Sequence, residues 1–143
     1  MRAISLWQPW ATLVALAEKE YETRSWFTDY RGPLAIHAAK RFSVSERELF
    51  YRQPFLGAFQ SHGLVNSNML PLGAVICTVE LVDCVPTEWA RTRIRDKGIA
   101  FGNYGGFRWA WKFANITVLD MPVPYRGSQK WFNYDYTRRI VQS

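Results

Sequence analysis

The segment from Leu72 to Val85 constrains the fold of this chain more than any other part of the sequence. It is almost entirely apolar, with Glu80 standing on the same side as Ile76 and Thr78. Such a run is typical of a strand that is buried on both faces. Because it is about twice as long as a common strand, it predicts a sheet that curves or closes into a barrel. An isolated buried carboxylate is costly, so we expect Glu80 to pair with an Arg or Lys inside that barrel.

Shorter strands and helices are expected around this long strand. Strand-forming or alternating residues predict strands over residues 2–7, 20–26, 34–39 and 108–118, followed by a last turn and strand between 122 and 132. Helices are expected after Pro9, from Ser43 to about Tyr51, and from Pro86 to near Gly98, with a loop over residues 52–71. No repeat or linker divides the chain, so the sequence predicts one α+β domain over residues 1–143.

The charge and composition of the chain favour some classes of function over others. Its 143 residues include 18 Lys and Arg against 12 Asp and Glu, which gives a formal net charge of +6. A modest positive excess favours a polyanionic partner. The seven Trp residues supply either a packed core or a surface that stacks on flat ligands. Because no apolar run is long enough for a membrane helix and Met1 is not followed by a signal-peptide core, we expect a cytoplasmic protein that does not enter the membrane.

No metal or cofactor site is expected from the sequence. Neither a Walker loop nor a nucleophile elbow is present, and the paired spacing of metal ligands is absent from Cys77, Cys84, His37 and His62. Two cysteines cannot build a disulfide framework, so both are expected to be free, buried thiols. Their separation of seven residues would place them on opposite faces of one strand.

A cluster of charged residues after the first helix is the best candidate site. If residues 20–26 form a strand, Glu22, Arg24 and Trp26 share one face, and Lys19 in the preceding turn can approach the same place. A carboxylate that accepts from a base amino group, beside two cations for phosphate or carbonyl oxygens, can bind a nucleotide. The alternative is a structural ion pair that closes one end of the barrel. Trp26 is expected either to stack on a ligand or to lie in the core.

Other segments carry further candidate ligand-binding residues. Trp7 and Gln8 lie where a strand passes into a helix, a position that can present an indole for stacking and an amide for hydrogen bonding. Trp10 belongs to an apolar stripe and is expected in the core. His37 and Lys40, at the end of a strand, can contact phosphate, although a lone His is more often a hydrogen-bonded, half-buried residue. A basic cluster, which is either solvated surface charge or a phosphate track, comprises Arg91, Arg93, Arg95 and Lys97.

Residues 17–24, Ala-Glu-Lys-Glu-Tyr-Glu-Thr-Arg, resemble the G-x-K-x-x-E-x-R signature of the ASCH family. The segments 4–10, 31–40 and 106–111 are also similar to family segments, in the same order along the chain. The resemblance implies a PUA-like fold, which is a small mixed β-barrel with flanking helices. Ala17 replaces the glycine of the signature. Alanine does not readily adopt a positive φ, so a helix end that needs this geometry is expected to be built differently.

The family resemblance also implies what the site does. It implies a cleft beside the barrel, lined by Lys19, Glu22 and Arg24 and suited to RNA or a modified nucleoside. On family grounds alone, Arg108, Arg126 and Lys130 are further candidates for the cleft. A domain that binds RNA or a modified nucleoside is therefore the leading hypothesis, without a metal or cofactor.

Two other functions stay open at this point. Some ASCH relatives are amidohydrolases that remove the acetyl group of N4-acetylcytidine with a Lys, a Thr three residues later and a distant Glu, and others are ribonucleases. Here Glu22 stands where that Thr is expected, and Thr23 is expected on the opposite strand face. A metal-independent hydrolase would use Glu22 as general base, with Lys19 or Arg24 stabilising the developing oxyanion. The last alternative is a protein-interaction domain that uses exposed Trp and Tyr side chains.

Overall fold

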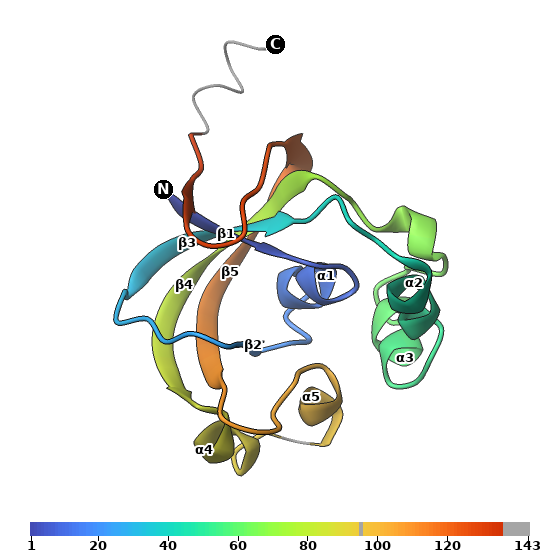
Figure 1. Cartoon of the computed structure of the whole chain (residues 1–143). Helices are drawn as coiled ribbons and strands as arrows, with labels where there is room; N and C mark the ends of the chain where they lie inside the picture. Colours follow the sequence, from blue (N-terminus) through green and yellow to red (C-terminus); the bar gives the residue numbers. More distant parts are fainter. Residues whose placement is uncertain (95, 136–143) are drawn as a thin grey trace.

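The computed structural model describes residues 1–94 and 96–135, in which a six-stranded sheet curves around a short central helix (Figure 1). The strands are β1 (Arg2–Leu6), β2 (Tyr21–Arg24), β3 (Gly32–Ala38), β4 (Ala74–Pro86), β5 (Trp109–Pro124) and β6 (Phe132–Asn133). Their order across the sheet is β2-β5-β4-β3-β1-β6, with β1 parallel to β3 and the other neighbouring pairs antiparallel. The predicted α+β class is confirmed. In the described residues β2 and β6 form the edges, so hydrogen bonds do not close the sheet into a complete barrel.

Short helices cover the open side of the curved sheet. They are α1 (Trp10–Ala15), α2 (Val44–Phe50), α3 (Phe55–Gln60), the 3₁₀ helix η1 (Ser67–Met69), α4 (Thr87–Arg91) and α5 (Asp96–Ala100). Figure 1 shows α1 within the curve of the sheet and α2 and α3 together at one side, whereas α4 lies at the end of β4. None of the helices in the described residues is long and apolar enough to span a membrane.

The long apolar segment forms β4, which confirms the predicted strand. A bulge in β4 determines which of its side chains face inward. β4 pairs with β3 on one side and with β5 on the other. Val82 is an extra residue in the pairing with β5, between Leu81 and Asp83. This bulge reverses the alternation of side chains, so Cys77 and Cys84 both enter the main core, and their expected placement on opposite faces was wrong. Both are free and buried as expected, and burial raises the pKa of Cys77 to about 12.

Glu80 lies on the outer face of β4, because Val79 and Leu81 on either side of it are buried in the main core. The Glu80 side chain is half-buried, and it forms no ion pair with a Lys or Arg among the described residues. The expected partner inside the barrel was therefore wrong. The alternation of the strand leaves this carboxylate within reach of water, which hydrates it without a paired cation.

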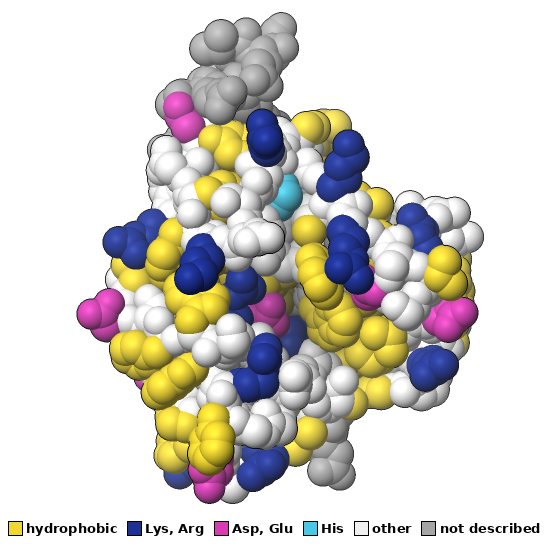
Figure 2. Space-filling model, viewed as in Figure 1, with side chains coloured by type: hydrophobic (Ala, Val, Ile, Leu, Met, Phe, Trp, Pro, Cys, Tyr) yellow, Lys and Arg dark blue, Asp and Glu magenta, His cyan; other side chains and the backbone are white. Residues whose placement is uncertain are grey.

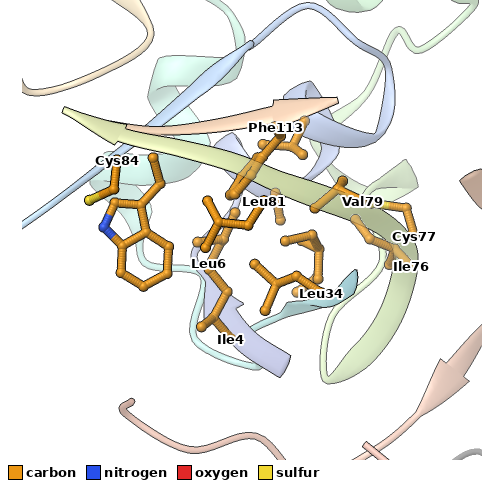
Figure 3. Packing of buried hydrophobic residues seen from close by; sticks show 14 residues of the cluster. Ile4, Leu6, Leu34, Ile76, Cys77, Val79, Leu81, Cys84 and Phe113 are labelled. Atoms are coloured by element: carbon orange, nitrogen blue, oxygen red, sulfur yellow. The ribbon is translucent and has the colours of Figure 1, made fainter. Parts of the chain in front are cut away.

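In the described residues, buried hydrophobic side chains form four clusters, and α1 lies between the two largest of them. The main core, on the inner side of the curved sheet and drawn in Figure 3, includes Ile4, Leu6, Leu34, Val79, Leu81 and Phe113. The second core packs α1 against α2 and α3 and includes Leu13, Phe50, Phe55, Phe59 and Phe101. Since Val14 of α1 belongs to the first core and its neighbour Leu13 to the second, α1 links the two.

Three segments differ from their sequence-based predictions. The strand expected over residues 108–118 continues to Pro124 as β5, so the last turn and strand, expected between 122 and 132, is reduced to β6. Residues 52–71, expected to form a loop, contain α3 and η1, because Phe55, Ala58 and Phe59 bury one helical face in the second core. The helix expected from Pro86 to near Gly98 is divided into α4 and α5, and Arg95 between them lies outside the described residues.

The end of α1 positions the charged residues of the predicted site. Ala17 has a φ of 60°, so the alanine itself adopts the left-handed conformation that glycine favours. The N–H groups of Ala17 and Glu18 donate to the carbonyls of Val14 and Leu13, each at 3.0 Å, which is the pattern of a Schellman motif. The expectation that the turn is built differently without glycine was wrong. The turn reverses the chain and brings Lys19 to the start of β2.

Replacing Ala17 with Gly is expected to raise the free energy of unfolding by about 1 kcal/mol, because it relieves the left-handed strain of alanine at a smaller cost in chain entropy. Urea denaturation measures the change. The matched control, Ala15→Gly within α1, is expected to lower the free energy of unfolding by about 1 kcal/mol. A loss of stability in Ala17→Gly would contradict the left-handed turn.

Candidate functional site

A cleft of about 1900 Å³ separates the inner side of the sheet from the helices. On the sheet side it is lined by Glu22, Arg24 and Trp26, and on the helix side by Trp10 and Phe101. Figure 2 shows the hollow near the centre of this face, with Lys and Arg side chains around it and an acidic side chain within it. Pockets for drug-sized ligands are about 300–1000 Å³, so this cleft has room for more than a single nucleoside.

Lys19 lies at the bottom of the cleft, where only 2% of its side chain is exposed. Its ammonium donates to the carbonyl of Phe101 (2.6 Å) and lies 3.5 Å from Oε1 of Glu22. Burial lowers the pKa of Lys19, and the neighbouring Glu22 carboxylate opposes that shift. With these two partners, Lys19 connects the start of β2 to the segment that follows α5.

Glu22 also connects Lys19 to Arg24. Oε2 of Glu22 lies 3.6 Å from Nη1 of Arg24, which donates weakly to the carbonyl of Ser5 at 3.4 Å. Burial lowers the pKa of Arg24, Glu22 raises it, and the nearby Arg108 lowers it further. Among the described residues, the buried Nε of Arg24 has no hydrogen-bond partner. Arg24, which lines the cleft, therefore keeps a buried donor unused.

Arg108 adds a second guanidinium near Arg24. Its Nη2 donates to the carbonyl of Thr23 (3.3 Å), whereas its buried Nε has no hydrogen-bond partner in the described part of the chain. Lys19 and Arg24 flank the carboxylate of Glu22, and Arg108 lies near Arg24, so these four side chains carry an excess of two positive charges. Excess charge held away from water is unfavourable unless an opposite charge neutralises it. The arrangement therefore favours an anionic ligand.

His37 lies in the cleft wall and is almost fully buried. Its Nε2 is 2.7 Å from the carbonyl of Tyr125, and its Nδ1 is 2.8 Å from Oγ of Ser5. A carbonyl only accepts, so Nε2 donates to Tyr125, and in the neutral ring Nδ1 accepts from the hydroxyl of Ser5. Burial lowers the pKa of His37, and the hydrogen bond to Tyr125 opposes the shift. The hydrogen bond to Tyr125 anchors the segment 125–127 to the sheet. The backbone at Gly127 lies so close to the His37 ring that a Cβ there would overlap the ring.

The rim of the cleft holds most of the other predicted residues. Trp7, with 46% of its surface exposed, lines the cleft together with the exposed Lys40. Trp26 is half-buried and contacts the core edge-on, but it also lines the cleft. Arg126 and Lys130 are exposed at the same rim. The structure thus brings these five residues to the cleft that contains Lys19, Glu22, Arg24 and Arg108.

Gln8 does not join the other predicted residues in the cleft. It is fully buried, its amide donates to Oγ1 of Thr12 (2.7 Å) and to the carbonyl of Pro71 (3.0 Å), and its carbonyl accepts from the Thr12 N–H. Gln8 therefore stabilises the start of α1. Trp10 and Phe101 are two of the cleft residues that the sequence analysis did not predict. Trp10 is half-buried in the cleft wall, and an apolar stripe in the sequence does not distinguish a residue of a cleft wall from a core residue. Phe101 contributes its backbone carbonyl, and no sequence pattern predicts such a contact.

Thr23 lies on the strand face opposite Glu22, as expected from the alternation of β2. Its hydroxyl accepts the N–H of Asn103 (3.0 Å). The position of the Thr used by amidohydrolase relatives is occupied by Glu22, which contacts two cations. In the described residues, no group of three or more His, Cys, Asp or Glu side chains is placed to hold a metal ion.

The two described arginines of the basic cluster lie outside the cleft. Arg91, at the end of α4, and Arg93 are exposed, and the guanidinium of Arg93 lies 3.4 Å from the ring centroid of Trp89. Arg95 and the side chain of Lys97 lie outside the described residues. Neither Arg91 nor Arg93 lines the main cleft.

The fold and the site together define a small α+β domain with a PUA-like curved sheet and a basic cleft lined with aromatic residues. The family model of the ASCH domain matches residues 4–140. The chain belongs to the ASCH domain family.

Two longer proteins contain a region similar to this chain. Activating signal cointegrator 1 of Mus musculus is 37% identical over 136 residues, a match that covers 92% of this chain and 22% of that protein. Activating signal cointegrator 1 of Homo sapiens is 34% identical over 136 residues, with the same coverage of both chains. The chain therefore spans 22% of the length of the relatives that it matches.

Solved structures of an ASCH protein from Zymomonas mobilis have a similar fold. One of them covers 99% of this chain and 93% of its own chain, with 15% sequence identity and a TM-score of 0.54. A single-substitution variant of that protein has a TM-score of 0.57 at 14% identity, covering 99% of this chain and 96% of its own. At this level of sequence identity, the likeness shows the shared fold.

The neutral His37 predicts that acid weakens the fold. Burial makes the pKa of His37 lower in the folded protein than in the unfolded chain, so the unfolded chain binds a proton first as the pH falls below about 6.5. The contribution of His37 to stability is fully present above the unfolded pKa and is lost as the pH falls through the folded pKa. Urea denaturation should show this decrease between about pH 7.5 and about pH 5. In His37→Gln that part of the decrease should vanish, and an unchanged pH dependence would argue against the neutral ring.

The buried ion pair of Lys19 and Glu22 predicts a non-additive mutant cycle. Glu22→Gln leaves the ammonium without its counterion and should lower the free energy of unfolding by about 2 kcal/mol. The double variant Lys19→Met with Glu22→Gln removes both charges and should recover at least half of this loss. Denaturation of the two single variants and the double variant measures the coupling. Additive effects would mean that the two side chains do not stabilise each other.

Proposed function

We propose that this chain binds single-stranded RNA in the cleft between the sheet and the helices. The observation that carries the proposal is the pair of half-buried guanidinium groups of Arg24 and Arg108, each with a buried Nε–H that has no hydrogen-bond partner among the described residues. With Lys19, they exceed the negative charge of Glu22. A phosphodiester supplies a negative charge and acceptor oxygens, which are the two things that this group lacks.

The rim of the cleft offers the other contacts that a nucleic-acid strand needs. Lys40, Arg126 and Lys130 are exposed cations that can follow the phosphates of a strand across the opening. Trp7 offers an exposed indole, and stacking of a base on an aromatic ring contributes about 1–3 kcal/mol. Every base has a flat face, so this combination favours a strand without requiring one sequence.

The size of the cleft favours a strand over a single modified nucleoside. A nucleoside would leave most of about 1900 Å³ unfilled, whereas sites for small molecules enclose about 300–1000 Å³ and surround most of the ligand. The ASCH resemblance, which implies RNA or a nucleotide, agrees with either ligand. The volume and the row of cations at the rim therefore support the polymer.

The test is the affinity for a fluorescently labelled oligouridine strand, followed by anisotropy over a range of salt concentrations. The unmodified protein should bind, and its affinity should fall linearly with salt on logarithmic axes. Arg108→Gln should weaken binding about tenfold and reduce the salt slope by about 0.7, because one contact to a phosphate of a single strand is lost. Free uridine in excess should not displace the strand.

Lys112→Gln is the matched control, because it removes a positive charge that pairs with Glu20 outside the cleft. It should leave the affinity for RNA nearly unchanged. No binding even at low salt would refute the proposal. Equal losses in Lys112→Gln and Arg108→Gln would mean that net charge alone attracts RNA, and displacement of the strand by free uridine would favour a nucleoside site.

A further inference from the structure

Four aromatic residues form an exposed patch beside the cleft, which we call the aromatic rim: Phe27, Trp89, Phe107 and Trp109. Phe107 is 100% exposed, and Phe27 and Trp89 are 49% and 42% exposed. Trp109 is half-buried and contacts Phe27 edge-on, with ring centroids 4.8 Å apart. Figure 2 shows hydrophobic side chains gathered beside the hollow, toward the end of the molecule where α4 lies in Figure 1. So many exposed aromatic side chains in one place indicate a contact surface.

The aromatic rim begins at the wall of the cleft. Phe27 follows Trp26 in the chain, and Phe107 and Trp109 stand on either side of Arg108. Both Trp26 and Arg108 line the cleft. The cleft wall and the aromatic rim are therefore formed by neighbouring residues of the same two segments of the chain.

The fold anchors the loop that carries Phe107. Gly106 has a φ of 65°, in the left-handed region that favours glycine. The hydroxyl of Thr87 donates to the carbonyl of Gly106 (3.4 Å), and the Thr87 N–H donates to the carbonyl of Arg108 (3.0 Å). Thr87 is the first residue of α4, so the same contacts hold Trp89 of that helix near the loop. Phe107 is thus presented to solvent from a loop that is fixed on both sides of it.

Cations lie at both ends of the aromatic rim. The guanidinium of Arg93 lies 3.4 Å from the ring centroid of Trp89, and Arg108, which is next to Phe107 and Trp109 in the chain, lines the cleft. Aromatic rings with guanidinium groups between them are typical of surfaces that bind single strands, because bases stack on the rings and phosphates pair with the cations. An apolar partner surface would leave these cations without counterions.

We propose that the aromatic rim is a second RNA-binding subsite, where bases of a strand leaving the cleft at Arg108 stack on Phe107 and on the rings beside it. This inference rests on the RNA binding proposed for the cleft, and it specifies the ligand further. The preferred ligand is a single strand long enough to occupy both the cleft and the aromatic rim, and a strand that fills only the cleft binds more weakly.

The test compares labelled oligouridines of about four and about twelve nucleotides, lengths at the two ends of the usual range for a small single-strand-binding domain. Phe107→Ala should weaken binding of the longer strand about tenfold and leave the shorter strand unchanged, because only the longer one reaches the rim. The substitution removes a fully exposed ring, so the fold should not be affected. Phe107→Trp should retain the affinity for the longer strand.

Met121→Ala is the control, because it truncates an apolar side chain that is 66% exposed and does not line the cleft. It should not change the affinity for either strand. An unchanged affinity of Phe107→Ala for the longer strand, beside a cleft that still binds the shorter one, would overturn the second subsite alone and assign the aromatic rim to a protein partner. Absence of binding by both strands in the unmodified protein would overturn the cleft proposal and this inference with it.

Discussion

The pairing of β4 with β5 is the constraint on which the rest of the structure depends. These strands span 13 and 16 residues, and strands of this length twist and coil instead of remaining flat. Extra residues in their pairing, such as Val82, add local bends, and Asn115 adopts a φ of 52° where the register shifts. The resulting curve makes a hollow that α1 fills. Because β2 pairs with the first part of β5, Glu22 and Arg24 lie on the inner side of that curve, at its open end.

The titratable residues of the cleft divide into two groups according to how their hydrogen-bonding capacity is used. Lys19 and His37 bind backbone carbonyls of distant segments, those of Phe101 and Tyr125, and so fix the walls of the cleft. Arg24 and Arg108 also contact backbone carbonyls but keep buried donors unused among the described residues. The first pair maintains the shape of the cleft, and the second pair supplies the charge that a ligand can neutralise. The exposed aromatic residues around the opening offer a ligand further contacts at the surface.

Much of the fold and part of the site could be predicted from local patterns. The apolar run before Pro86 predicted β4, and alternation placed Glu22 and Arg24 on one face and Thr23 on the other. Predictions failed where a contact distant in sequence decided the outcome. Gln8 looked available as a ligand-binding amide, but the carbonyl of Pro71 and the side chain of Thr12 use its amide group. The loop predicted over residues 52–71 contains helices, because their apolar faces pack in the second core, which local sequence patterns do not reveal.

The sequence by itself determined the elements and the faces that their side chains share, because the periods of a strand and a helix are properties of the backbone and act over a few residues. It thereby determined that Lys19, Glu22 and Arg24 lie together. Only the tertiary structure decided what surrounds them. A bulge at Val82 and a left-handed alanine at position 17 redirect side chains in ways that composition does not reveal. The two largest hydrophobic clusters share one short helix, and an open cleft lies beside them, because packing is set by contacts between segments far apart in the chain.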